Sequence, residues 1–85
     1  MNIVYADEFR KRFHKLPSGL QRLYRIQETR FKENWHDPRL HVKKLTGQPL
    51  PFSFRVTRNY RVLFIFIARD AVLMATIDNR KDIYR

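Results

Sequence analysis

The stretch that decides the fold is residues 51–85, where the segments PFSFRV (51–56), NYRVLFIFIA (59–68) and AVLMATI (71–77) precede NRKDIYR (79–85). The first three segments have the length and the β-branched and aromatic content of strands. Within the first, apolar residues at 52, 54 and 56 alternate with polar residues at 53, 55 and 57, the period-two pattern of a half-buried strand. The sequence therefore predicts a sheet that carries arginines on its outer face.

The turn between the first two strands decides which arginines meet, because loop length fixes which residues face each other across a hairpin. A two-residue loop at 58–59 pairs Arg55 with Val62. A three-residue loop over 57–59, with Asn59 in the left-handed conformation, instead pairs Arg55 with Arg61. We prefer the three-residue loop, because it also keeps the aromatic residues of both strands on one face. Two facing guanidinium groups would form a fork for one phosphodiester.

The composition indicates one small basic domain spanning residues 1–85, long enough for a single two-layer core. Lys and Arg number 18 against 8 Asp and Glu, for a formal net charge of +10. Such an excess favours a polyanionic partner, and RNA, DNA and an acidic protein all qualify. A membrane surface fits less well, because no predicted helix combines strongly basic and apolar faces.

Several classes of chemistry lack support in the sequence. There is no cysteine and no apolar run of signal-peptide or membrane-spanning length, so we expect a cytoplasmic protein. The carboxylates are scattered, the three histidines lack metal-site spacing, and the two glycines, Gly19 and Gly47, stand far apart. We therefore expect neither a metal nor another cofactor.

The N-terminal half predicts a strand followed by two helices. Residues 2–5 are β-prone, and Asp7 is well placed to cap a helix that ends at Pro17. Ser18 is a candidate cap for a longer helix to about Trp35. Two amphipathic helices joined by a few residues form an antiparallel hairpin whose apolar side needs a sheet to cover it.

The rest of the predicted order completes an α+β fold. Gln27 interrupts the apolar stripe of the second helix, and the connector 36–51 contains four breakers and little expected regular structure. The predicted order is strand, helix, helix and three strands, β-α-α-β-β-β, with the second strand turn near 68–70. The helical hairpin would pack on an antiparallel sheet.

The cationic sheet suits RNA cleavage by the RNA's own 2′-hydroxyl. This reaction needs a group to take the hydroxyl proton, cations to stabilise the phosphorane, and a group to protonate the leaving 5′-oxygen. Arg55, Arg61 and Arg80 are candidates for stabilising charge. The candidates for proton transfer are Tyr84, Lys43, Lys44 and His41. A solvated basic face is the competing interpretation of any single arginine, so the cluster carries the hypothesis.

Four segments in order, FRKRFHKLP (9–17), HVKKLTG (41–47), SFRVTRNYRVLF (53–64) and NRKDIYR (79–85), resemble the RelE/ParE toxin superfamily of bacterial toxin-antitoxin systems, RelE-like branch. The resemblance covers essentially the whole chain. It implies a compact α+β domain and a ribosome-dependent, metal-independent mRNA endoribonuclease that inhibits translation. It also implies a cognate antitoxin that wraps the toxin, which by itself is expected to be monomeric.

Carried over by position, the RelE-like pattern places a basic residue at Arg55, the phosphate-stabilising arginine at Arg61, a further arginine at Arg80 and the catalytic tyrosine at Tyr84. The expected RNA and ribosome contacts are His41, Lys43, Lys44, Arg58, Lys81 and Arg85. The chain departs from the pattern at three positions: Phe52 and Phe54 stand where RelE carries lysines, and Asn79 where many relatives have histidine.

Two other functions stay open from the sequence. The ParE-like branch shares the fold and poisons DNA gyrase by binding it. A basic binding module without catalysis would keep the charge, but would not require Arg61 and Tyr84 specifically.

Overall fold

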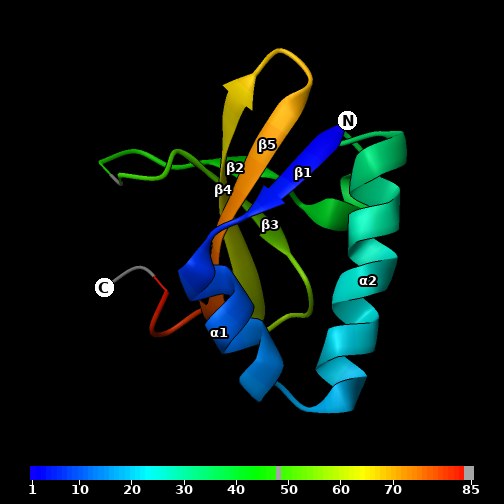
Figure 1. Ribbon diagram of the computed structural model, residues 1–85, viewed down its shortest axis with the longest axis vertical. Coiled ribbons are helices and arrows are strands. Elements are labelled where there is room, and N and C mark those ends of the chain that lie inside the picture. Colours follow the sequence, from blue (N-terminus) through cyan, green and yellow to red (C-terminus); the bar gives the residue numbers. More distant parts are fainter. Residues whose placement is uncertain (48, 84–85) are drawn as a thin grey trace.

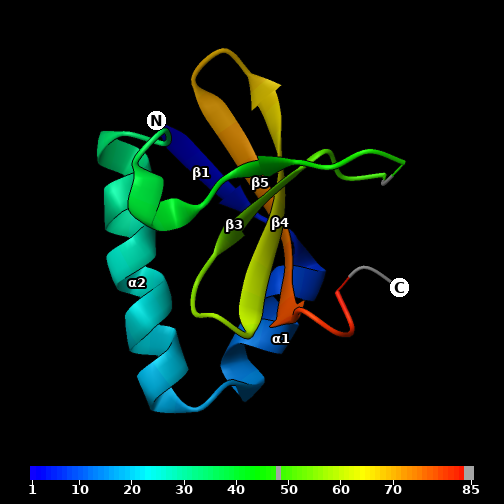
Figure 2. The same cartoon turned by 180° about the vertical axis from the view of Figure 1, so that it is seen from behind.

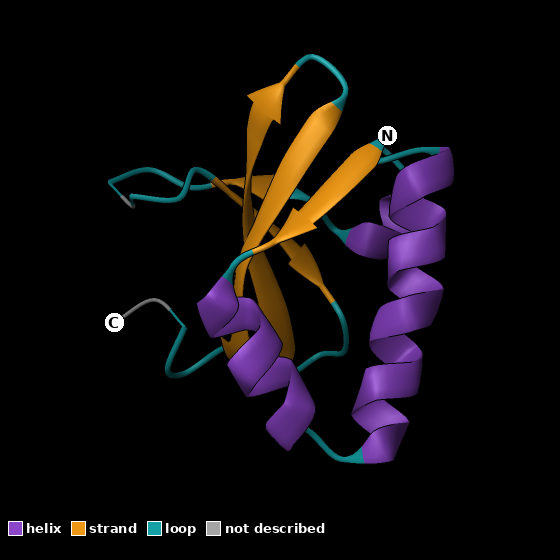
Figure 3. Ribbon diagram, viewed as in Figure 1, coloured by secondary structure: helices purple, strands orange, loops and turns teal. Residues whose placement is uncertain are grey.

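The computed structural model describes residues 1–47 and 49–83, in which two helices pack against a twisted sheet (Figures 1 and 3). The helices are α1 (Asp7–Lys15), α2 (Ser18–Glu33) and a 3₁₀ turn η1 (Pro38–Leu40), and the strands are β1 (Asn2–Tyr5), β2 (Lys43–Lys44), β3 (Phe52–Arg55), β4 (Tyr60–Ala68) and β5 (Ala71–Asn79). The predicted α+β class is confirmed, and the predicted strand, helix, helix and three strands occur in that order, with the short strand β2 added before β3. Among the described residues, no helix is long and apolar enough to cross a membrane.

The sheet is mixed, which corrects the prediction of an antiparallel sheet. Its strand order is β1-β5-β4-β3-β2. Neighbours from β5 to β2 are antiparallel, but β1 pairs with β5 in parallel, from Asn2 opposite Ala71 to Tyr5 opposite Met74. Parallel neighbours need a long crossover, and here everything from α1 to β4 lies between them. The strand pattern at 2–5 predicted the strand but gave no information on its direction.

The connector is more ordered than the sequence predicted. The side chain of Asp37 accepts a hydrogen bond from the backbone N–H of Arg39 at 2.9 Å and so caps η1, and hydrogen bonds from Arg39 lower the pKa of Asp37 to about 2. Strand β2 then adds the two lysines to the edge of the sheet next to β3. A two-residue edge strand is too short to show alternation in a sequence.

Both helices begin one residue earlier than predicted, because Asp7 and Ser18, the expected caps, are already their first residues. The residue before α1 is Ala6 and the one before α2 is Pro17, and neither helix has a side-chain cap. Asp7 and Ser18 are therefore first-turn residues. The Asp7 carboxylate still interacts favourably with the positive N-terminal end of the helix dipole. Helix α2 ends at Glu33 rather than near Trp35.

One core lies between the helices and the sheet. It combines Phe9 of α1 with Tyr24 and Phe31 of α2 and with inward-facing residues of the strands, including Phe54 and Phe64. Gln27, which appeared to interrupt the apolar stripe of α2, is 5% exposed and points into this layer. Its Nε2 donates to the carbonyls of Arg39 (3.0 Å) and Arg55 (2.7 Å), so it joins α2 to η1 and β3.

Candidate phosphate-binding face

Arg55 and Arg61 face each other across β3 and β4, as predicted from the hairpin pattern. This register results from a bulge before the turn and not from the expected three-residue loop. The backbone N–H groups of Val56 and Thr57 both donate to the carbonyl of Tyr60, at 3.0 and 3.3 Å, so two residues oppose one, as in a β-bulge.

The connection beyond the bulge contains only residues 58 and 59, and it is closed by Tyr60 N donating to Thr57 O at 3.3 Å. Asn59 is not left-handed, because His41 is the only described residue besides glycine with a positive φ. The extra residue in the bulge, rather than a third loop residue in a special conformation, shifts the register by one and brings the arginines opposite.

The arginine pair lies on the face of the sheet turned away from the core. The neighbouring pair, Phe54 opposite Val62, is fully buried, and successive side chains along a strand alternate between faces. Figures 1 and 2 show α2 on one side of the sheet, with the chain after β5 and the β2–β3 connection on the other. The two arginines therefore project where the helices do not cover the sheet.

Hydrogen bonds fix the side chain of Arg61 and the backbone of Arg55. Nη1 of Arg61 donates to the carbonyls of Thr57 (3.0 Å) and Arg58 (3.3 Å), which keeps its guanidinium close to the turn. Arg55 is held through its carbonyl by Gln27, while its Nε is buried and makes no hydrogen bond within residues 1–47 and 49–83. Directly facing like charges repel, so an anion bound between them is the natural complement.

A carboxylate on the next strand faces Arg61, and the sequence did not predict it. Asp78 on β5 is the partner of Arg61, and its Oδ2 accepts a hydrogen bond from Nη1 of Arg12 on α1. A small cavity of about 140 Å³ lies beside this ion pair. Its lining residues are Glu8, Arg12, Thr76, Asp78, Asp82 and Ile83. Only the register between β4 and β5 reveals the position of Asp78 relative to Arg61.

Arg80 lies next to the same hairpin turn. Its backbone N–H donates to the carbonyl of Asn59 at 2.7 Å, and Arg80 and Lys81 are both exposed. Asn79 organises this segment, because its Oδ1 accepts a hydrogen bond from Lys81 N at 2.9 Å. Its carbonyl also accepts from Asp82 N and Ile83 N, both at 3.0 Å. The predicted site residues Tyr84 and Arg85 lie outside the described residues.

The connector lysines lie on different faces of the sheet. Lys43 pairs with Ser53 and therefore shares the face of Arg55, whereas Lys44 pairs with Phe52 and shares the opposite face. His41 is exposed at the end of η1 with φ 49°, and Arg58 is exposed in the hairpin turn. The structure thus brings Lys43, Arg55 and Arg61 together on one face and leaves Lys44 outside this group.

The two phenylalanines at the lysine positions of the family pattern belong to the core. Phe54 is 0% exposed, and the ring of Phe52 packs on Phe64 with centroids 5.5 Å apart. On this strand the cation-bearing face is occupied by Ser53 and Arg55. Arg55, together with Lys43 on the neighbouring strand, therefore supplies the positive charge.

The fold itself matches solved toxins. The RelB–RelE antitoxin–toxin complex from Methanococcus jannaschii contains a chain with a TM-score of 0.74 and 20% identity, over 95% of this chain and 94% of that one. The chain therefore shares its fold with a chain of this antitoxin–toxin complex. A copper-bound mutant toxin from Helicobacter pylori has the same fold, with a TM-score of 0.71 and 13% identity over 99% of both chains. No protein-family model and no curated protein matches the sequence.

The main chemistry that this face of the sheet offers is anion binding by arginine. No group of three or more His, Asp or Glu side chains in the described part of the chain could hold a metal ion. Guanidinium groups stay protonated at any physiological pH and donate several hydrogen bonds in a plane, which suits the oxygens of a phosphate.

Proposed function

We propose that the protein is a RelE-like toxin of a toxin-antitoxin system that cuts ribosome-bound mRNA without a metal ion. The observation that carries the proposal is the register that places Arg55 opposite Arg61 on the open face of the sheet, next to Arg80 at the hairpin turn. The RelE/ParE fold and the RelE-like motifs support the same function. A cognate antitoxin and a cytoplasmic site of action are part of this proposal.

In the proposed reaction, the 2′-hydroxyl of the RNA attacks the adjacent phosphorus and the bond to the 5′-oxygen breaks. The products are a 2′,3′-cyclic phosphate and a free 5′-hydroxyl. Arg55 and Arg61 bind the non-bridging oxygens, whose negative charge increases in the transition state. Arg80 supplies a third cation from the side of the turn. Tyr84 takes part in proton transfer or stacks on a base.

Lys43 is our preferred second candidate for proton transfer or RNA contact, because it shares the face of Arg55. The remaining predicted RNA and ribosome contacts are His41, Lys44, Arg58, Lys81 and Arg85. Among the described residues of this set, Arg58 in the hairpin turn and Lys81 after β5 are exposed, which suits binding to rRNA phosphates around the bound message.

The test is to add the purified protein to a translating extract and map the mRNA ends. Wild type and Arg69→Ala should cut, whereas Arg61→Ala and Tyr84→Phe should cut at least about 10²-fold more slowly. Arg69 is the matched control, because it is exposed in the turn at the other end of β4. Intact message after incubation with the wild type would exclude the proposed activity.

A ParE-like gyrase poison is the second candidate. It is favoured by the packing of Phe52 and Phe54 in the core at the two lysine positions, and by the hydrogen bond of Asn79 in the C-terminal turn. Each feature removes a group that would otherwise take part in catalysis. Inhibited DNA supercoiling by gyrase, together with intact message in the extract, would establish this candidate over the nuclease.

A further inference from the structure

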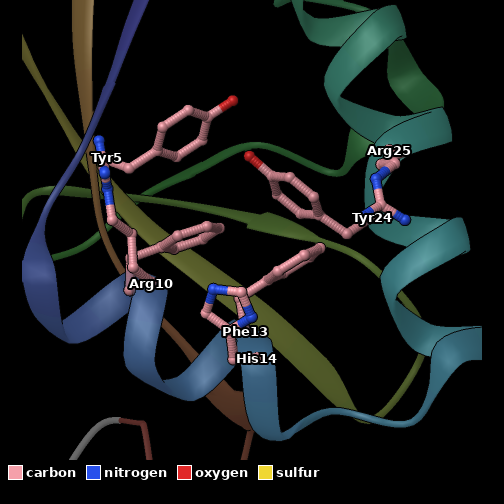
Figure 4. Close-up of a pocket in the computed structure, with 7 residues that line it drawn as sticks. Tyr5, Arg10, Phe13, His14, Tyr24 and Arg25 are labelled. Carbon is pink, nitrogen blue, oxygen red and sulfur yellow. The ribbon is translucent and has the colours of Figure 1, made fainter.

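A second possible binding site lies between the two helices, on the other side of the sheet from Arg55 and Arg61. It is a pocket of about 310 Å³ with an aromatic interior and a cationic rim (Figure 4). The aromatic residues are Tyr5, Phe9, Phe13 and Tyr24, and the rim consists of Arg10, His14 and Arg25. The volume lies at the lower end of the range for small-ligand pockets, which is about 300–1,000 Å³.

The aromatic rings of the interior are closely packed. The ring centroids of Phe9 and Phe13 lie 5.2 and 5.3 Å from that of Tyr24, and Phe9 and Tyr24 are almost fully buried. Figure 4 shows the hydroxyl ends of Tyr5 and Tyr24 turned toward each other. Both hydroxyls donate to Oε1 of Glu28, from Tyr24 at 3.1 Å.

These tyrosines keep the interior of the pocket uncharged. Burial, together with the nearby Glu28 carboxylate, raises the pKa of both Tyr5 and Tyr24 well above the ordinary tyrosine value. Both therefore stay protonated at physiological pH. A ligand in this pocket meets neutral rings rather than phenolate charge.

The rim is positively charged on both helices. The guanidinium of Arg10 lies 5.9 Å from the ring centroid of Tyr5, and that of Arg25 lies 5.4 Å from the ring centroid of Phe13. His14 is four residues after Arg10, on the same side of α1. All three rim residues are exposed. The chemistry of the pocket therefore calls for a ligand with a planar apolar part and a negative charge.

A nucleotide meets both requirements. Bases unstacked from single-stranded RNA bind to aromatic rings and to guanidinium planes, and their phosphates bind to arginine. An aliphatic anchor from an acidic protein fits less well, because the exposed aliphatic residues of α2, Leu23 and Ile26, are not part of the pocket.

We propose that the pocket between α1 and α2 binds one unpaired nucleotide of an RNA chain. Its base would lie against the Tyr5 and Phe13 side of the pocket, and its phosphate would accept hydrogen bonds from Arg10 and Arg25. This inference goes beyond the proposed function and does not require that the protein cuts RNA. It gives the protein a second RNA contact, separated from the cationic face by the sheet.

The experiment titrates uridine 5′-monophosphate into protein carrying Arg61→Ala and follows binding by NMR chemical shifts and calorimetry. We expect shift changes at Tyr5, Phe13 and Tyr24. Arg10→Gln with Arg25→Gln should weaken binding by about tenfold or more, as expected for lost charge-assisted hydrogen bonds. The matched pair Lys11→Gln with Arg22→Gln removes the same charge from the same helices outside the pocket and should have little effect.

Comparison ligands separate the alternatives. Uridine without phosphate and inorganic phosphate should each bind clearly more weakly than the nucleotide. Equal losses in the two double variants, or phosphate binding as tightly as the nucleotide, would overturn the proposal in favour of unspecific charge. A tyrosine-containing acidic peptide that binds the pocket when the nucleotide does not would overturn it in favour of a protein partner. Because the Arg61→Ala background and a mononucleotide exclude cleavage, a negative result here leaves the proposed nuclease untouched.

Discussion

Replacing Gln27 with leucine removes the side chain that connects α2 to the strand of Arg55. Its amide donates to the carbonyls of Arg39 at 3.0 Å and Arg55 at 2.7 Å, and its Oε1 accepts from Nη1 of Arg30 at 2.9 Å. Leucine has a similar size, so the substitution removes these hydrogen bonds with little change in volume. We expect lower stability and a displaced Arg55.

The magnitude follows from the burial of the site. Gln27 is 5% exposed, so water does not readily replace the lost donor. Each of the two carbonyls left without its partner costs about 1–3 kcal/mol. Burial of the apolar leucine side chain stabilises the folded protein by about 2 kcal/mol. The expected net loss in the free energy of unfolding is therefore about 2 kcal/mol.

Urea unfolding of the wild type and Gln27→Leu measures this loss. The control is Gln21→Leu on the same helix, whose amide also donates to two carbonyls, Phe13 at 2.9 Å and Leu16 at 3.2 Å, but is only partly buried. We expect this control to cost less than 1 kcal/mol, roughly the net value of a solvated hydrogen bond. A Gln27→Leu protein as stable as the wild type would refute the structural role assigned to this amide.

Two further predictions concern pH and the connector lysines. Because Tyr24 is protonated in the folded protein and ionises near pH 10 once unfolded, stability should be full below about pH 10 and fall above it. Tyr24→Phe should lessen the slope above about pH 10 by about 1.4 kcal/mol per pH unit, measured by thermal unfolding from about pH 8 to 11, and an unchanged slope would contradict this. Lys43→Gln should weaken RNA binding or slow cleavage several-fold more than Lys44→Gln, because only Lys43 shares the face of Arg55. Equal effects in a filter-binding and cleavage assay would show that the face does not matter.

The hairpin illustrates what the sequence can predict. Of the two registers that the candidate turns allow, only one keeps Phe54 and Val62 together on the core face, and the structure has this register. The turn was predicted wrongly, because a bulge at 56–57 gives the same register as a three-residue loop with a left-handed Asn59. Side-chain alternation therefore determined the facing pair, whereas backbone hydrogen bonds decided how the chain turns.

Other parts of the site depend on contacts far apart in the sequence. In the sequence, Gln27 looked like an interruption of an apolar stripe. Its partners are the backbone carbonyls of Arg39 and Arg55, and because every residue type has a carbonyl, the sequence does not reveal them. Asp78 lies opposite Arg61 because of the register between β4 and β5, which the sequence alone does not give. The separation of Lys43 from Lys44 likewise needs the register of an edge strand that is two residues long.

The central claim is that Arg55 and Arg61 bind the same phosphate during cleavage. A double-mutant cycle on the rate of mRNA cutting in a translating extract tests it most directly, with Arg55→Ala, Arg61→Ala and the double variant, and Arg69→Ala as control. We predict that each single change slows cutting by about 10²-fold. The double variant should then be slower by much less than the product of the two, because both side chains stabilise one charge. A double variant slowed by the full product, about 10⁴-fold, would show that the two arginines act independently and would contradict the claim.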